Sequence, residues 1–189
     1  SKLRIYHLLA GLAAQHKVTL LSFGDAVETP LPPELSKLCT IRQLVPWQPF
    51  RPTSWRARRG FLSLTPRSVI DTYSATMAHA IAREIDSGAY DLIIASEFAT
   101  AAYMRHFSNI PALLEDVELG IMVEQYQQAN SVKGRLRHGL TWIKHRHYLK
   151  QVLQQFRVCT VVSERERQLV SDAVPDYKAI EIIPNCVDL

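Results

Sequence analysis

The chain has 189 residues, of which 47% are hydrophobic and 21% charged, and its formal net charge is +4 at pH 7. This composition is typical of one soluble globular domain and excludes disordered and collagen-like classes. No run approaches the roughly 20 apolar residues that a membrane-spanning helix needs. Cys39, Cys159 and Cys186 are far apart and odd in number. They argue against a disulfide framework or a structural zinc site and favour a reducing cytoplasm.

Apolar residues at helical spacing predict four helical regions. They cover 2–16, 70–87, 96–107 and 120–156, with a break in the last near 130–134. A further helix is expected to open at Ser163, because Ser163 and Glu166 have the spacing of a capping box.

Short apolar runs between these helices predict buried strands. The runs cover 17–23, 41–45, 90–95, 111–115, 158–162 and 179–183. They are continuous rather than half-polar, which is typical of a parallel sheet covered by helices on both faces. We therefore predict an α/β fold, a Rossmann-like domain with a mostly parallel sheet. In such folds ligands bind beyond the carboxyl ends of the strands.

Segments at both ends and in the middle of the chain carry a family resemblance. They read RIYHLLAGLAAQHKVTLLSF, then Asp116-Val117-Glu118, then VVSERERQLV and IEIIPNCVDL. In this order they resemble the amino-terminal, acceptor-side domain of family-4 glycosyltransferases of the GT-B fold. The resemblance implies a retaining enzyme that moves a sugar from a nucleotide-sugar donor to a glycan or lipid-linked acceptor, without a metal or other cofactor. It also implies a role in bacterial envelope or exopolysaccharide synthesis.

The same resemblance sets the expected domain organisation. Residues 1–183 would form the acceptor-side domain, and 184–189 would begin the linker to a donor-binding domain. The family's opening strand and glycine loop are absent from the sequence, and Cys186 stands where the family has glycine. Without the donor domain the chain is expected to be inactive. The surface that would meet that domain could instead pair two copies, so a homodimer is a further expectation.

Asp116 and Glu118 are the principal acceptor-binding candidates and weak catalytic ones. They follow an apolar run, and alternate residues of an extended segment point the same way, so both would face the interdomain cleft while Glu115 points away. One carboxylate could accept a hydrogen bond or a proton from an acceptor hydroxyl. The alternative is that Asp116 caps the following helix.

Polar residues at other strand ends give further candidates. Ser96 and Glu97 are acceptor-binding candidates where a strand meets a helix, although Ser96 could simply be an N-cap. Ser163, Glu164 and Asn185 are weak candidates for contacts to the donor. The capping-box spacing already explains Ser163 without any ligand.

Two basic regions interleave cations with aromatic residues and suggest a peripheral membrane face at the inner side of the plasma membrane. The membrane-face candidates are Arg56, Arg58, Arg59, Lys144, Arg146 and Lys150. The alternative is an ordinary solvated helix face. No nucleic-acid motif is present, and the histidine spacing does not predict a metal site.

Two other functions remain open on the sequence alone. The chain could be a non-catalytic α/β binding module that acts as a partner or membrane adaptor. It could also be an unrelated flavodoxin-like domain that binds a small molecule, although no glycine-rich phosphate loop is present.

Overall fold

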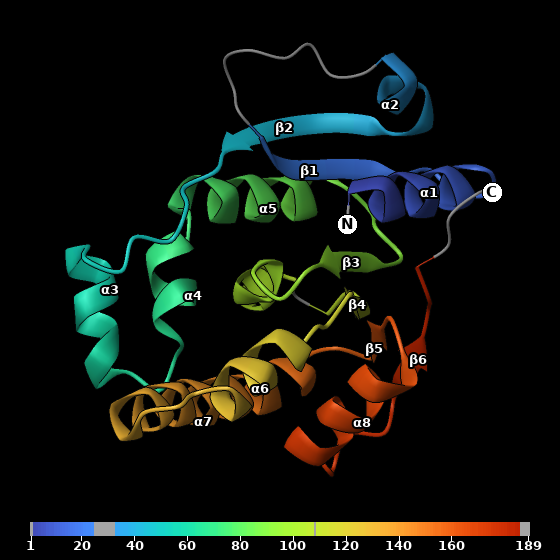
Figure 1. Ribbon diagram of the computed structural model, residues 1–189. Helices are drawn as coiled ribbons and strands as arrows, with labels where there is room; N and C mark the ends of the chain where they lie inside the picture. Colours follow the sequence, from blue (N-terminus) through green and yellow to red (C-terminus); the bar gives the residue numbers. More distant parts are fainter. Residues whose placement is uncertain (1, 25–32, 108, 186–189) are drawn as a thin grey trace.

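The computed structural model describes residues 2–24, 33–107 and 109–185. It is an α/β fold with parallel strands flanked by helices, which confirms the predicted class (Figure 1). The strands are β1 (Thr19–Gly24), β2 (Thr40–Pro46), β3 (Ile93–Ser96), β4 (Ala112–Glu115), β5 (Val158–Val161) and β6 (Ile180–Ile182). The α-helices are α1 (Lys2–Ala13), α2 (Pro33–Leu38), α3 (Trp55–Arg59), α4 (Arg67–Thr72), α5 (Ala75–Ser87), α6 (Gly120–Gln127), α7 (Val132–Leu153) and α8 (Glu164–Ala173). Two 3-10 helices are η1 (Gly60–Leu62) and η2 (Thr100–His106).

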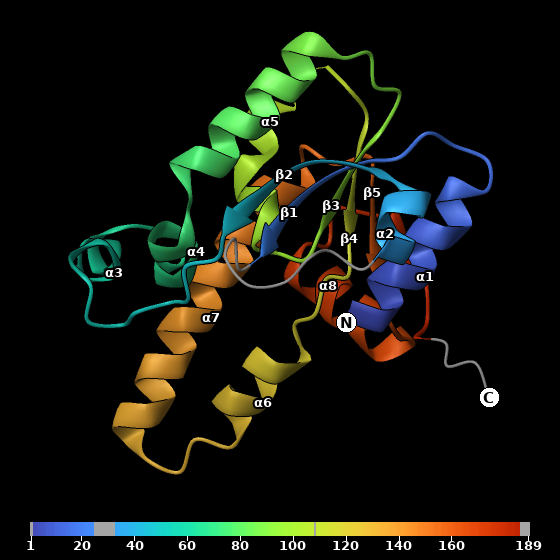
Figure 2. The same ribbon diagram turned by 90° about the horizontal axis from the view of Figure 1, so that it is seen from above.

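The strands form two sheets rather than the single sheet expected. β1 pairs with β2, and β3 to β6 pair in sequence order, with every pair parallel. α1 lies on one side of the strands, and α5 and α7 lie on the other (Figure 2). The sheets are separate because no described strand pairs β1 with β3.

The core lies between the four-stranded sheet and its covering helices. The central strands are continuously apolar, and Leu114 and Val161 are fully buried. The carboxyl-terminal half of α7 adds Leu149 and Leu153, four residues apart on one helical face and both fully buried.

Helix boundaries differ from the predicted ones where a side chain caps a new start. The region 70–87 is two helices, because the Ser74 side chain accepts a hydrogen bond from the Met77 N–H and starts α5. Helix 96–107 is shorter than predicted, since Ser96 still belongs to β3 and the helical turn begins at Thr100. The predicted break near 130–134 is confirmed between α6 and α7.

The segment that carries α3, η1 and α4 is rich in arginine and forms an ordered lobe. Ser54 caps α3, and its hydroxyl also donates to the buried carboxylate of Asp71 in α4. Arg67 donates to the carbonyl oxygens of Pro52 and Ala57. Lys144 of α7 donates to the carbonyl of Gly60 at 2.9 Å, so the lobe is attached to the long helix. Among the described residues no helix is both long and apolar enough to cross a membrane.

Candidate functional site

Polar side chains gather at the carboxyl ends of β3, β4 and β5. Ser96 and Glu115 are register partners at the ends of β3 and β4, so the residues that follow them are also neighbours. We call this group the carboxyl-edge cluster; it comprises Arg4, Ser96, Glu97, Glu115, Asp116, Glu118 and Glu166. Five carboxylates and one guanidinium make it strongly negative.

Glu115 is the buried centre of the cluster. Its carboxylate accepts a hydrogen bond from Arg4 Nε at 2.7 Å and another from the Ser96 hydroxyl at 2.7 Å. The expectation that Glu115 points away from the site is therefore wrong. Arg4 of α1 places a positive charge beside the Glu115 carboxylate. This counter-charge stabilises the carboxylate inside the protein, where the Glu115 side chain is only 1% exposed.

Arg4 also fixes the segment that follows β6. Its Nη1 donates to the carbonyl oxygen of Ile183 at 2.7 Å and to Asn185 Oδ1 at 3.1 Å. The Asn185 side chain is thus occupied within the protein. One arginine in the first helical turn of the chain joins α1, β4 and the end of β6.

Asp116 has an unusual backbone and an unpaired oxygen. Its φ is 63°, in the left-handed region that L-residues adopt at a cost. Its N–H donates to the Thr160 hydroxyl at 3.2 Å. Its Oδ1 is buried and has no hydrogen-bond partner among the described residues. This geometry replaces the expected extended segment, and Asp116 does not cap α6, whose N-cap is Leu119.

The surroundings of the Asp116 carboxyl group also disfavour its ionised form. Burial raises its pKa, and the negative charge of Glu115 raises it further, while Arg4 opposes both effects. The pKa of Glu118 is also raised, by desolvation and then by the charges of Asp116 and Glu166. The charges of the two principal candidates therefore influence each other. An unpaired buried acceptor with a raised pKa is a feature of functional sites.

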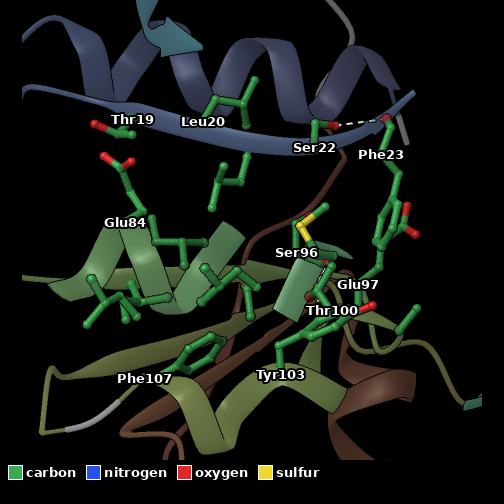
Figure 3. A pocket seen from close by; sticks show the side chains of 18 of the residues that line it. Thr19, Leu20, Ser22, Phe23, Glu84, Ser96, Glu97, Thr100, Tyr103 and Phe107 are labelled. Carbon is green, nitrogen blue, oxygen red and sulfur yellow. Dashed lines mark hydrogen bonds between the residues drawn. The ribbon is translucent and has the colours of Figure 1, made fainter. Parts of the chain in front are cut away.

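Glu97 follows β3 as Asp116 follows β4, and it shares the left-handed backbone with φ 67°. Its N–H donates to the Glu115 carbonyl oxygen at 2.9 Å. Ser96 is not an N-cap, because its hydroxyl donates to Glu115 instead. Ser96 and Glu97 also line one end of a cavity between β1 and β3 (Figure 3).

Glu166 has a role that the sequence did not indicate. Ser163 accepts a hydrogen bond from the Glu166 N–H at 3.2 Å, as a capping box requires. The Glu166 carboxylate, however, accepts from the backbone N–H groups of Leu119 at 2.7 Å and Gly120 at 3.0 Å. It therefore caps α6 rather than its own helix. Glu164 is exposed and pairs with Arg167 at 3.0 Å, so neither Ser163 nor Glu164 presents a free ligand group.

The six cations predicted to face a membrane do not form one surface, and most of them contact other parts of the protein. Arg56 donates to the Tyr73 carbonyl, and Lys144 donates to the backbone of η1. Arg146 and Lys150 lie on another face of α7, where they contact Ala173 and Asp176. Arg58 and Arg59 remain exposed on α3, with Arg59 over the Trp55 ring.

Within the described ranges no group of three or more His, Cys, Asp or Glu residues is arranged to hold a metal ion. Arg4, Thr160 and Glu166 are the cluster members and neighbours that sequence reasoning missed. The capping-box spacing from Ser163 was the one feature of the sequence that pointed to Glu166, and no feature pointed to Arg4. Comparison with known proteins finds no matching family model, curated protein or solved structure.

Proposed function

We propose that this chain is the acceptor-binding domain of a retaining glycosyltransferase, which moves a sugar from a nucleotide-sugar donor to a glycan or lipid-linked acceptor. The observation that carries the proposal is the buried, unpaired Asp116 Oδ1 at the carboxyl edge of a parallel sheet. Ligands of such sheets bind at this edge. An acceptor hydroxyl that donates to Oδ1 would supply the hydrogen bond that the carboxylate lacks.

The charge of the carboxyl-edge cluster favours a neutral, hydroxyl-rich ligand over a phosphate. Asp116, Glu118 and Glu97 all add negative charge, and Arg4 is already engaged by Glu115. A diphosphate placed here would be repelled, whereas sugar hydroxyls can donate to several carboxylates. The donor diphosphate would therefore be held by another part of the enzyme.

Asp116 would also influence the acceptor hydroxyl chemically. Because its pKa is raised, its carboxylate is a stronger base than an ordinary aspartate. In this proposal the attacking hydroxyl donates its hydrogen bond to the Asp116 carboxylate. As its oxygen bonds to the anomeric carbon of the donor sugar, the bond from that carbon to the phosphate oxygen breaks, the nucleoside diphosphate leaves with the electron pair, and the hydroxyl proton passes to Asp116. Glu118 would orient a second hydroxyl.

The test is a titration of the ¹⁵N-labelled chain with free glucose, galactose, mannose and N-acetylglucosamine at millimolar concentrations. The proposal predicts that at least one saccharide shifts the amide signals of Glu97, Asp116 and Glu118. Asp116→Asn should weaken that binding at least tenfold, and the matched control Asp172→Asn on exposed α8 should not. Absence of shifts with every sugar, or equal binding by both variants, would overturn the proposal.

We further propose that the lobe around α3 and η1 rests on an anionic membrane. Its exposed residues are unusually apolar: Leu62 is 97% exposed, Trp55 66% and Phe61 63%. Arg58 and Arg59 lie beside them on α3. Interfacial aromatic residues with adjacent cations are typical of proteins that lie on a bilayer surface. This position would bring a lipid-linked acceptor to the domain.

Vesicle co-sedimentation tests this second proposal. Binding to vesicles of phosphatidylcholine with phosphatidylglycerol should exceed binding to phosphatidylcholine alone, and the joint change Trp55→Ala with Leu62→Ala should abolish it. The exposed control Lys178→Gln should bind as the parent chain does. Equal binding to both vesicle types, or retained binding by the double variant, would contradict a membrane-facing lobe. Membrane binding without any sugar binding would favour the adaptor alternative over the glycosyltransferase.

A further inference from the structure

Another cavity, of about 290 Å³, lies in the lobe that carries α3, η1 and α4. We call it the lobe pocket; it is lined by Trp55, Arg56, Arg59, Gly60, Ser63 and Ile70. Its volume is close to the lower limit of the range of about 300–1,000 Å³ that small-molecule sites span. The lobe pocket therefore suits one compact chemical group rather than a whole glycan.

Arg56 and Arg59 bring two positive charges to the lobe pocket. They are three residues apart on α3, so their side chains are neighbours on the helix surface, and both line the pocket. Arg58 lies between them in the sequence and does not line it. Like charges on one helix face repel each other, and an anion bound between them would remove this repulsion.

The lobe has little negative charge of its own to neutralise these arginines. Residues 51–73 contain five arginines and one acidic residue, Asp71. The buried Asp71 carboxylate accepts hydrogen bonds from the Arg51 N–H at 2.7 Å and from the Ser54 hydroxyl. Asp71 is thus engaged within the lobe, and the pocket keeps a net positive charge.

The pocket arginines also have hydrogen-bond donors to spare. Within the described ranges Arg59 makes no hydrogen bond or ion pair, and its guanidinium lies over the Trp55 ring, 5.5 Å from the ring centroid. Arg56 uses one nitrogen, Nη2, to donate to the Tyr73 carbonyl at 2.9 Å. A guanidinium has five N–H donors in a planar fork that matches the oxygens of a phosphate. The two arginines can therefore donate to one phosphate group from two directions.

Ser63 adds a hydroxyl to the same pocket. Its oxygen accepts a hydrogen bond from the Thr65 N–H at 3.0 Å, which orients the side chain. The hydroxyl can still donate its hydrogen to a ligand oxygen. Every polar side chain that lines the lobe pocket can thus donate to an anion.

Exposed apolar side chains alternate with the pocket residues along the chain. Phe61 and Leu62 follow Gly60 directly, Leu64 follows Ser63, and all three are exposed. A soluble phosphate in the pocket would leave these side chains in water. A phosphate that carries a hydrocarbon chain would cover them, because burial of apolar surface is favourable. The surroundings of the pocket therefore favour a lipid phosphate.

The lobe pocket and the carboxyl-edge cluster suit different parts of one acceptor. The lobe follows the carboxyl end of β2, and both β2 and β3 point toward the side on which α3 and α4 lie (Figure 1). The carboxyl-edge cluster is negative and suits sugar hydroxyls, whereas the lobe pocket is positive and suits a phosphate. A sugar joined to a lipid through a phosphate contains both groups.

We propose that the lobe pocket binds a phosphate ester carried by a lipid, with Arg56, Arg59 and Ser63 donating hydrogen bonds to the phosphate oxygens. Two lipids present this chemistry: the one that carries the acceptor sugar and a phospholipid of the bilayer. The inference rests on the proposed function, because it takes the lobe to lie on a membrane and the acceptor to be lipid-linked. It adds a phosphate to the groups that the domain recognises.

A titration of the ¹⁵N-labelled chain tests the proposal, with each lipid kept below the concentration at which it aggregates. The probes are geranyl phosphate, dihexanoylphosphatidylglycerol, geraniol and sodium phosphate. Binding is followed by the side-chain Nε–H signals of Arg56 and Arg59 and by the Gly60 amide. The test variant is Arg59→Gln. The matched control Arg58→Gln removes the same charge from the neighbouring position, which does not line the pocket.

At least one of the two lipid phosphates should bind about tenfold or more tightly than geraniol and sodium phosphate. Arg59→Gln should weaken that binding about tenfold or more, and Arg58→Gln by less than about twofold. Tighter binding of geranyl phosphate would assign the pocket to the lipid of the acceptor, and tighter binding of dihexanoylphosphatidylglycerol to a bilayer headgroup. The proposal is overturned if neither lipid binds, if sodium phosphate binds as tightly as the lipids, or if the two variants lose binding equally.

Failure of this inference is distinguishable from failure of the proposed function. The saccharide titration monitors Glu97, Asp116 and Glu118, whereas the lipid titration monitors residues of the lobe pocket. Saccharide binding without lipid-phosphate binding would overturn the lobe pocket and leave the acceptor site standing. Lipid-phosphate binding without saccharide binding would support the lobe pocket and overturn the glycosyltransferase proposal.

Discussion

Glu97 and Asp116 occupy equivalent positions at the ends of adjacent parallel strands, and both have left-handed backbones, with φ of 67° and 63°. Neither is glycine, so both positions carry conformational strain. Two strained acidic residues side by side at the carboxyl edge of a sheet are costly to fold. A role of these residues in ligand binding would explain why this cost to stability is retained.

Asp116→Asn should stabilise the chain at pH 7. The change removes a buried carboxylate that has no hydrogen-bond partner on Oδ1, and a gain of about 1 kcal/mol is expected. Thermal unfolding of the variant and the parent chain measures the difference. A destabilised variant would show that the Asp116 charge is compensated in the folded protein.

The benefit of Asp116→Asn should depend on pH in a defined direction. Burial and the Glu115 charge raise the pKa of Asp116 above the value of about 3.9 in the unfolded chain. The folded state therefore binds the proton more tightly, and this stabilisation is lost as pH rises from about 3.9 through the raised value. The variant's advantage should be smallest below about pH 3.9 and grow toward pH 7. A constant difference in melting temperature between pH 3 and pH 7 would contradict the raised pKa.

Glu97→Gly should be more stable than Glu97→Ala by about 1 kcal/mol, because an L-residue pays a steric penalty at φ 67° that glycine avoids. The Glu97 side chain is exposed, so its removal changes the stability of either variant little. Chemical denaturation of the two variants gives the difference directly. Equal stability of the two would mean that the backbone at Glu97 relaxes out of the left-handed region.

Arg4→Met should destabilise the fold by roughly 3 kcal/mol, because it leaves the buried Glu115 carboxylate without its counter-charge. The double variant Arg4→Met with Glu115→Met should recover most of that loss, since no unpaired buried charge remains. Denaturant unfolding of both variants measures the recovery. A double variant as unstable as Arg4→Met alone would show that packing, rather than the ion pair, dominates the contact.

Gly120→Ala should cost about 1–3 kcal/mol. A Cβ at residue 120 would lie 2.5 Å from Glu166 Oε1 and would displace the carboxylate that caps α6. The matched control Gly11→Ala has open space around its Cβ and should not lose stability. Equal effects of the two substitutions on stability would argue against the capping of α6 by the Glu166 carboxylate.

The sequence predicted the fold well and the site in part, for physical reasons. Continuous apolar runs such as 111–115 mark buried parallel strands, because both faces of each strand are covered. The contacts of Glu115 could not be predicted, because its partner Arg4 is 111 positions away. The φ of Asp116 could not be predicted either, since sequence favours glycine at such positions. Glu166 had the spacing of a capping box, but its carboxylate reached another helix.

The most direct test of the proposed acceptor site is the pKa of the Asp116 carboxyl, measured by ¹³C NMR with and without the saccharide that binds most tightly. The account predicts a raised pKa in the free chain and a lower one in the complex, because a sugar hydroxyl that donates to Oδ1 stabilises the ionised form. An ordinary pKa in the free chain, or a pKa that saccharide binding leaves unchanged, would contradict the assignment of Asp116 as the acceptor-binding carboxylate.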